Sequence, residues 1–402
     1  MGHADNPADP RGQSGSRGQS PALPARADLV ILGAGIMGLW AAVKAERHGI
    51  ETVLVDAGRP GQGASGGLLG ALMPHMPDKW NDKKQFQFDA LLSLEDEIAH
   101  IEAATGIACG YRRSGRLIPL PKPHLRTIAL RHSADAETRW RQGDRRFHWH
   151  VIDRPPDDGW PDASFAETGL VHDTFAARVS PRSLVSALAA FLRSARHVRI
   201  VEGLEAERID PARNRIVFRS GESIAFGHAI VAAGHRSFPL LEAISPALPR
   251  PIGQPVKGQA ALLRADVDPS LPVIFLNGLY VVAHEGGHVA VGSTSEDAFE
   301  DAFSTDSRLD DLIVRARALV PALGQAPVVE RWAGLRPKAI DRDPMVGPHP
   351  DHPHVIALTG GFKVSFGLAH RLSDAALGAV KSGEIRLPAS FTLENHLSAA
   401  SR

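Results

Sequence analysis

Three glycines near the N-terminus have the spacing of a phosphate-binding turn. They are Gly33, Gly35 and Gly38, in the run Gly-Ala-Gly-Ile-Met-Gly. The first permits a tight turn out of a strand, the second lets the backbone approach a pyrophosphate, and the third lets helix and strand pack closely. Asp56 ends the next apolar run, where a carboxylate accepts hydrogen bonds from ribose hydroxyls. These residues predict a dinucleotide site, and the alternative is a structural glycine turn without a ligand.

A second loop of small residues, 61–67, follows Asp56. A simple NAD dehydrogenase would continue here with a third strand and helix, whereas this loop has the composition to reach along a longer dinucleotide. The alternative is a flexible surface loop. Two distant segments, 230–234 and 360–361, also end in glycines, which suggests that they return to the same ligand. A flavin head group lying across the fold would need such segments, so FAD is favoured over NAD.

The elements that must position these residues form an interleaved pattern. Continuous apolar runs at 28–33, 51–56, 228–233 and 354–359 are typical of buried parallel strands. Shorter runs at 259–264, 272–276, 279–283 and 288–292 are typical of antiparallel strands joined by turns. Helical periodicity occurs at 36–48, 84–105, 181–195, 307–320 and 366–381. The predicted fold class is α/β (α+β overall), with a Rossmann-type dinucleotide-binding domain interleaved with an antiparallel-sheet substrate domain.

This interleaving predicts a division of the chain into alternating parts. The cofactor-binding domain is expected at 27–75, 180–250 and 336–390, the last part with a C-terminal helix. The substrate domain is expected at 76–179 and 251–335. Residues 1–26 are expected to be a disordered leader, and residues 391–402 a tail.

Composition excludes several other classes of protein. The 45 basic and 45 acidic residues balance, so no overall field favours nucleic acid, and the basic stretch 139–146 is interpreted as a solvated face. The single cysteine, Cys109, excludes intrachain disulfides and cysteine-ligated clusters. The leader has no apolar core of a signal peptide, and the longest apolar stretch, 29–43, is too short for a membrane span. We therefore expect a cytoplasmic protein. The histidine groups at 148–150 and 349–354 lack the spacing of a helix-borne zinc site, so no metal is expected.

Seven further segments carry a resemblance to a known family. They are GASGGLLGA (63–71), VAAGHRS (231–237), PVKGQ (255–259), LNGLYVVAHEGGHVAVGST (276–294), WAGLRPKAIDRDPMVGPHP (332–350) and GGFKVSFGLAH (360–370), together with the initial VILGAGIMG (30–38). From about residue 27 to 385 the chain resembles the D-amino-acid oxidase superfamily of flavoproteins, and its glycine oxidase branch most closely.

The resemblance implies which residues bind FAD. The ADP part would be held by Ile36, Met37, Asp56 and Ala57, with the adenine passing Ala206. The pyrophosphate and flavin would lie along Gln62, Gly63, Ala64, Ser65, Gly66, Gly67 and Leu68, with Ala233 and Gly234 near the pyrophosphate. The pyrimidine end of the flavin would be wrapped by Gly360, Gly361, Phe362, Lys363, Val364, Ser365 and Phe366. Non-covalent FAD is expected, because the surroundings of His75 do not match the family's covalent attachment sequences.

The resemblance also implies three residues of the reaction site. Arg336 would pair with the substrate carboxylate, Tyr280 would occupy an active-site tyrosine position, and Lys363 stands where the family motif G-H-x-R has an arginine. Arg336 could instead form a structural ion pair with Asp341 or Asp343, and Tyr280 could be a core residue. Since lysine lacks the planar fork of arginine, we expect a substrate larger than glycine, N-substituted or bearing a second acid that meets Lys363. If Lys363 points to solvent instead, specificity would lie in the 76–180 region.

The reaction implied by the resemblance is oxidation of the C–N bond of an amino acid or secondary amine to an imine, with reoxidation by O2 or an electron carrier. Two alternatives remain open: an FAD-bearing subunit of a heteromeric amine or opine dehydrogenase, and a tRNA-modification flavoprotein. The expected partner is a small amine or amino acid, and a homo-oligomer or a partner subunit is compatible with the sequence.

Overall fold

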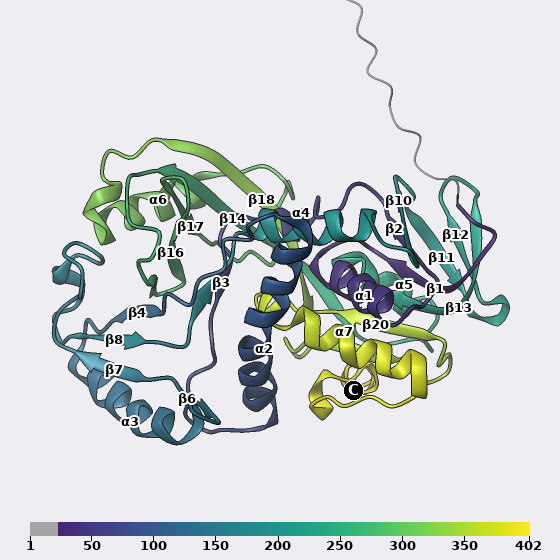
Figure 1. Cartoon of the computed structure of the whole chain (residues 1–402), viewed down its shortest axis with the longest axis horizontal. Helices are drawn as coiled ribbons and strands as arrows, with labels where there is room; N and C mark the ends of the chain where they lie inside the picture. Colours follow the sequence, from purple (N-terminus) through teal and green to yellow (C-terminus); the bar gives the residue numbers. More distant parts are fainter. Residues whose placement is uncertain (1–22) are drawn as a thin grey trace, which may run out of the picture.

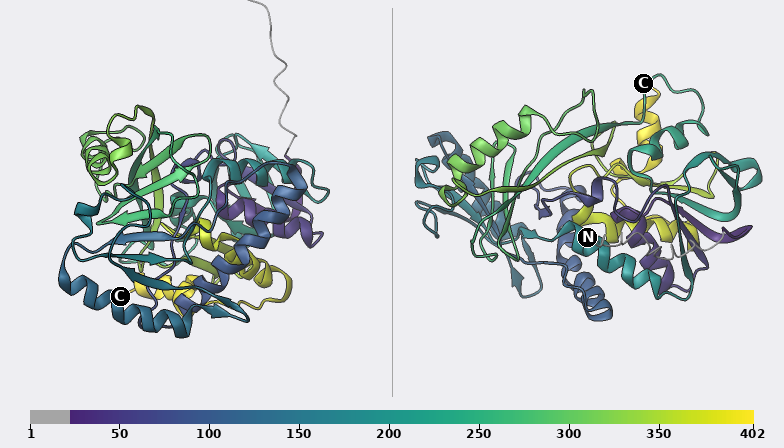
Figure 2. Two further views of the ribbon diagram at one scale, coloured as in Figure 1. Left: turned by 60° about the vertical axis from the view of Figure 1, so that its left-hand side comes forward. Right: turned by 90° about the horizontal axis from the view of Figure 1, so that it is seen from above.

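The computed structural model describes residues 23–402, so most of the predicted leader lies outside the described residues. Figure 1 shows two lobes side by side, each built around a large sheet, and the two further views in Figure 2 agree. The long helix α2 (Asp82–Thr105) lies between them and packs against α4 (Pro181–Arg193) and α7 (Ser365–Ser382). The α/β class expected from the sequence is confirmed.

The first sheet is mostly parallel and comes from distant parts of the chain. Its strands follow the order β10 (Val198–Glu202), β2 (Thr52–Asp56), β1 (Arg26–Leu32), β13 (Ser223–Val231), β12 (Arg215–Phe218) and β11 (Ala206–Asp210). The far end of β13 also pairs in parallel with β20 (Val355–Thr359), which carries β19 (Met345–Pro348) on its other edge. Strands expected near residues 28, 51, 228 and 354 therefore meet in one sheet.

Both faces of this sheet are covered, which explains the continuous apolar runs. Leu29 and Ile31 of β1 pack in one cluster with α1 (Ile36–Arg47), α4 and α7, while Val30 and Leu32 pack in another. The second cluster contains α5 (Ser237–Glu242) and the C-terminal helix α8 (Leu393–Ala400). A strand that is buried on both faces has apolar residues at successive positions, and does not show the alternation of apolar and polar residues that a strand with one exposed face shows.

The second sheet is almost wholly antiparallel. Its order is β18 (Val328–Ala339), β14 (Gly253–Arg264), β17 (His288–Gly292), β16 (Leu279–His284), β15 (Val273–Leu276), β4 (Arg116–Pro119), β8 (Leu170–Asp173) and β7 (Trp149–Ile152). Only the β15–β4 pair is parallel. Helix α6 (Ser307–Leu319) covers one face with an apolar cluster, and the opposite face is turned toward the first lobe.

The structure contains three helices that the sequence analysis did not predict: α3 (Pro123–Arg139), α5 and α8 (Leu393–Ala400). α3 was missed because Ala129 and Ala136 are its sole buried residues, which leaves almost no apolar stripe along the helix. α8 lies in the expected tail 391–402, and its buried Leu393, His396 and Ala400 fasten that segment to the first lobe. Strand β18 also runs through the boundary expected between residues 335 and 336.

Two short strand pairs complete the description. β3 (Ala71–Leu72) pairs with β9 (Ala177–Arg178), and β5 (Arg141–Gln142) pairs with β6 (Arg145–Arg146) in an exposed hairpin. Within residues 23–402, no helix combines the length and the apolar character that crossing a bilayer requires.

Candidate active site

The glycine turn after β1 is as tight as its sequence predicts. Gly33 has φ +99°, and a Cβ there would lie 2.5 Å from the carbonyl oxygen of Ala232 on the neighbouring strand connection. A Cβ on Gly38 would lie 1.8 Å from the carbonyl oxygen of Gly33. No side chain fits at either position, so the turn brings the start of α1 directly onto the sheet.

The start of α1 lies beside small residues and has no side-chain cap. The N–H of Ile36 donates to the Ser65 hydroxyl at 2.9 Å. The Asp56 carboxylate accepts from the N–H of Ala34 at 2.6 Å and of Gly58 at 2.8 Å. The positive end of the helix dipole favours an anion here, and the Asp56 carboxylate stands at the strand end where a ribose would be expected.

A cavity of about 910 Å³ opens from this turn and extends to the face of the second sheet. Nearly all residues expected to contact cofactor or substrate line it: Gly33, Gly35, Ile36, Met37, Asp56, Ala57, Gln62, Gly63, Ala64, Ser65, Gly67, Leu68, Ala206, Ala233, Gly234, Tyr280, Arg336, Phe362, Lys363, Val364, Ser365 and Phe366. Gly38, Gly66, Gly360 and Gly361 are not among the lining residues. Gly38 and Gly361 serve packing, since a Cβ on Gly361 would lie 2.4 Å from Cε of Met37.

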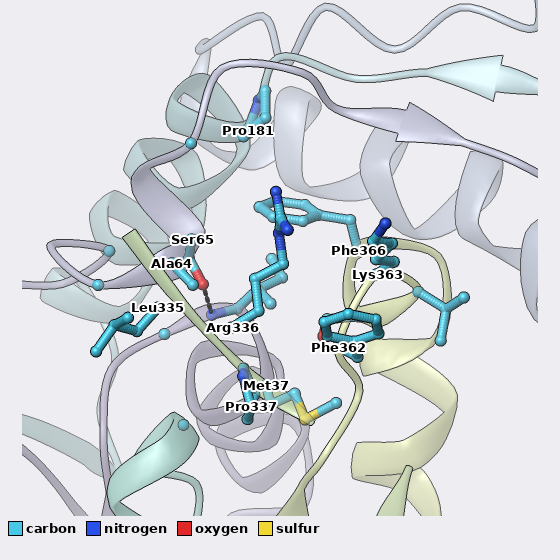
Figure 3. A pocket seen from close by; sticks show the side chains of 18 of the residues that line it. Met37, Ala64, Ser65, Pro181, Leu335, Arg336, Pro337, Phe362, Lys363 and Phe366 are labelled. Carbon is cyan, nitrogen blue, oxygen red and sulfur yellow. Dashed lines mark hydrogen bonds between the residues drawn. The ribbon is translucent and has the colours of Figure 1, made fainter. Parts of the chain in front are cut away.

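Arg336 enters this cavity from β18 without a carboxylate partner. Figure 3 shows its side chain between the Ser65 loop and the segment that carries Phe362 and Lys363. Its only hydrogen bond among the described residues runs from Nη1 to the carbonyl oxygen of Thr294, at 3.1 Å. Burial lowers the pKa of Arg336 to about 10, which still leaves it charged at neutral pH.

The structural ion pair considered for Arg336 is therefore wrong. Asp343 pairs with Lys83 at 2.6 Å, and Asp341 accepts a hydrogen bond from Asn395 at 3.3 Å. The guanidinium instead lies across Gly258 of β14, where a Cβ would be only 2.1 Å from Nη2. A guanidinium that faces a cavity with unpaired N–H donors can bind a carboxylate through two charge-assisted hydrogen bonds.

Tyr280 stands in a row of cavity residues on one face of the second sheet. Strand pairing aligns Trp332 with Ala260, Ala260 with Gly292, Gly292 with Tyr280, and Tyr280 with Phe275. Phe275 and Tyr280 pack with their ring centroids 4.7 Å apart. Burial raises the pKa of Tyr280, so its phenol is protonated and available as a hydrogen-bond donor. The small residues in the middle of the row leave the space between the aromatic side chains open.

Lys363 faces the open cavity rather than bulk solvent. It lines the cavity, and burial together with the nearby charge of Arg336 lowers its pKa. Its ammonium lies 5.5 Å from the ring centroid of Phe362, a residue with φ +42°. Two cations therefore occupy the same end of the cavity.

Several lining residues were not predicted from the sequence. His235, Arg236, Leu204 and Glu205 lie near the Asp56 end, and Arg116, Phe275, His75 and Trp332 lie toward the sheet. Trp332 lies in a segment that carries the family resemblance and Phe275 in a predicted strand, but only the strand register shows that both side chains face the cavity. Arg116 lies outside every predicted helix, strand and motif, so no local signal in the sequence marks it.

Comparison with known proteins agrees with this geometry. A family model described as FAD dependent oxidoreductase matches residues 28–375. The chain belongs to this FAD-dependent oxidoreductase family. A glycine oxidase of Pseudomonas aeruginosa is 27% identical over 347 residues, covering 85% of this chain and 91% of the relative.

Two solved structures share the fold. The crystal structure of glycine oxidase from Geobacillus kaustophilus has a TM-score of 0.80 at 22% identity, covering 92% of this chain and 99% of the other. That of iminodiacetate oxidase from Chelativorans sp. BNC1 has a TM-score of 0.76 at 21% identity, covering 90% and 98%. The recognition of the D-amino-acid oxidase superfamily and of FAD as its cofactor is confirmed.

The cavity residues of this FAD-dependent oxidoreductase fit FAD. The anion-binding start of α1 and the carboxylate of Asp56 lie at one end, and a volume of about 910 Å³ is near the upper limit of ligand cavities. Within residues 23–402, no group of three or more histidine, cysteine, aspartate or glutamate side chains is placed to hold a metal ion.

Proposed function

We propose that this protein oxidises the C–N bond of an amino acid or secondary amine larger than glycine. The observation that carries the proposal is Arg336, a buried guanidinium without an ion-pair partner, beside a second cation in the cavity of an FAD-dependent oxidoreductase. Bound FAD would accept the two electrons that the C–N bond loses. The amine loses two electrons and two protons to become an imine, and water then hydrolyses the imine to a carbonyl compound, with release of ammonia or of the remaining amine.

The protein's own residues would bind and orient the substrate. Arg336 holds the carboxylate through a charge-assisted pair, which fixes the position of the α-carbon. Tyr280 offers a protonated hydroxyl above the same space, and Lys363 adds a second positive charge. Asp56 and Glu205 are the only carboxylate side chains among the described lining residues, and Glu205 pairs with Arg236 at 2.7 Å. The reaction end of the cavity is therefore positively charged and suited to an anionic substrate.

The test is anaerobic bleaching of the purified yellow protein with a panel of amino acids and secondary amines. We expect FAD to be released on acid precipitation, and at least one amino acid to bleach the flavin. O2 or an electron carrier would then restore the colour, which also separates an oxidase from a dehydrogenase. Protein that binds NAD but not FAD, or a flavin that no amine reduces, would contradict the proposal.

Substitution of the carboxylate-binding residue gives a second test. Arg336→Lys should weaken substrate capture by about 1–3 kcal/mol, because a bidentate charged pair is lost while FAD stays bound. If the methyl ester of the substrate reacts as well as the free acid, Arg336 does not bind the carboxylate.

Lys363→Ala tests the size preference. The variant should lose more turnover with the preferred substrate than with glycine, because the second charge acts on the larger molecule. An equal loss for all substrates, or glycine as the best substrate of the wild type, would contradict this part of the proposal.

A further inference from the structure

Arg116 is a further cation on the cavity wall, and its environment is unlike that of the similarly buried Arg178. It is 3% exposed, and its Nε donates to Asp173 at 2.6 Å. Its terminal nitrogens, Nη1 and Nη2, have no hydrogen-bond partner among the described residues, and Nη2 is fully buried. Buried donors are almost always paired, so an unpaired guanidinium end requires an explanation.

Two nearby arginines show how this fold satisfies a guanidinium that has only a structural role. Arg178, 1% exposed, donates through Nη1 to Gly110 and through Nη2 to Pro269 and Glu285. Arg113 likewise donates through both terminal nitrogens, and in both residues it is Nε that lacks a partner. Arg116 has the opposite arrangement: Asp173 holds it by Nε, its Cζ lies 5.6 Å from the ring centroid of Trp149, and its terminal nitrogens have no hydrogen-bond partner among the described residues, at the wall of the cavity.

Strand register places Arg116 beyond the aromatic row. It pairs with Val273 on β15, two residues before Phe275, so its side chain shares a sheet face with Phe275 and Tyr280. Arg336 lies on β18, at the other edge of the same face. The strand order places Tyr280, on β16, between Arg336 on β18 and Arg116 on β4. The cavity thus has a cationic site at each side of an apolar aromatic wall.

We infer that Arg116 is the determinant of a second carboxylate subsite, and that the substrate is an amino acid or secondary amine with a distal carboxylate at the end of an aliphatic chain. This inference rests on the proposed function and names its substrate class. The first carboxylate pairs with Arg336, the chain lies against Phe275 and Tyr280, and the distal carboxylate pairs with the free fork of Arg116. An arginine fork matches a carboxylate in two parallel hydrogen bonds, which would satisfy the donors that the protein leaves unpaired.

The experiment compares N-(ω-carboxyalkyl)glycines of increasing chain length with their ω-carboxamides in anaerobic flavin reduction by the holoenzyme. At one chain length the acid should exceed its carboxamide at least tenfold in kcat/KM. The double substitution Arg116→Gln with Asp173→Asn should reduce this ratio to within about twofold. It removes both charges together, and the Asn side-chain oxygen can still accept from the N–H groups of Phe175 and Ala176, as Asp173 does at 3.0 and 2.8 Å.

Two matched variants separate the subsite from general damage. Asp173→Asn alone retains Arg116 and should retain the acid preference. Arg178→Lys alters an equally buried arginine outside the cavity lining and should leave the acid-to-carboxamide ratio unchanged. A ratio that survives the double substitution, or the absence of any acid preference in the wild type, would overturn the inference.

A binding measurement keeps this inference distinct from the proposed reaction. Calorimetric titration with unreactive glutarate and adipate should show binding at least tenfold tighter than butyrate, and the double substitution should remove that difference. If the dicarboxylates bind through Arg116 but no amine bleaches the flavin, the proposed oxidation fails and the subsite stands. If amino acids are oxidised but dicarboxylates gain nothing from Arg116, the subsite fails and the oxidation stands.

Discussion

Gly258 should be essential for the position of Arg336, although it touches neither cofactor nor substrate in our proposal. A methyl group on Gly258 would lie 2.1 Å from Nη2 and 2.2 Å from Cζ of Arg336. Since unstrained contacts begin near 3.5 Å, Gly258→Ala must displace the guanidinium by roughly 1.4 Å or more. The clash involves the end of a flexible side chain, so the strands β14 and β18 should remain paired.

The expected effect is large because catalysis depends on orientation. A misplacement of about 1 Å can cost about 10²-fold in rate, so kcat/KM should fall about 100-fold, which corresponds to about 2.7 kcal/mol. The assay is single-turnover flavin reduction over a range of substrate concentrations, with the melting temperature and FAD content as controls. Both controls should match the wild type.

A double-mutant cycle gives the decisive comparison. In an Arg336→Ala background there is no guanidinium to displace, so Gly258→Ala should add little further loss. The reasoning is refuted if Gly258→Ala keeps full kcat/KM, or if it causes the same 100-fold loss when Arg336 is already absent.

Three further predictions follow from burial and charge. Burial and the nearby charge of Arg336 lower the pKa of Lys363, so its charge is lost at a lower pH than that of a solvent-exposed lysine; KM should therefore increase as pH rises, and Lys363→Arg should move the increase to higher pH in initial-rate profiles. Burial lowers the pKa of His284 to about 4, so its contribution to stability is present above the unfolded value near 6.5 and is lost as pH falls toward 4. His284 by itself should contribute a loss on the order of 2 kcal/mol to the free energy of unfolding between pH 7 and pH 5, so His284→Gln, which still donates to the loop carbonyls, should lose less than the wild type in urea unfolding over that range; equal losses would contradict the assignment. Leu393→Ala in α8 should cost about 2–5 kcal/mol in the same assay, whereas the exposed Ser398→Ala should change little, and a neutral Leu393→Ala would show that α8 does not stabilise the fold.

Features that depend on local backbone chemistry were predictable from the sequence. Within one strand–turn–helix unit, Gly33 is required by its positive φ and Gly38 by its close approach to the Gly33 carbonyl oxygen, and Asp56 ends the strand beside it. The buried parallel strands were recognisable because packing on both faces demands continuous apolar side chains. A helix with a weak apolar stripe was not recognisable, and α3, with two buried alanines, was missed for that reason.

Features that depend on contacts between distant segments came only from the tertiary structure. The family resemblance identified Arg336 as a candidate site residue. That Arg336 has no ion-pair partner is a tertiary feature, because Asp343 pairs with Lys83 and Asp341 accepts a hydrogen bond from Asn395. The sequence did not identify Arg116 as a site residue. Its position at the cavity depends on the hydrogen bond from its Nε to Asp173 and on the register of β4 against β15, and both are tertiary features. Periodicity reports which face of an element is buried, whereas strand order and register decide which side chains from separate elements meet, and that decision is made by packing across the whole sheet.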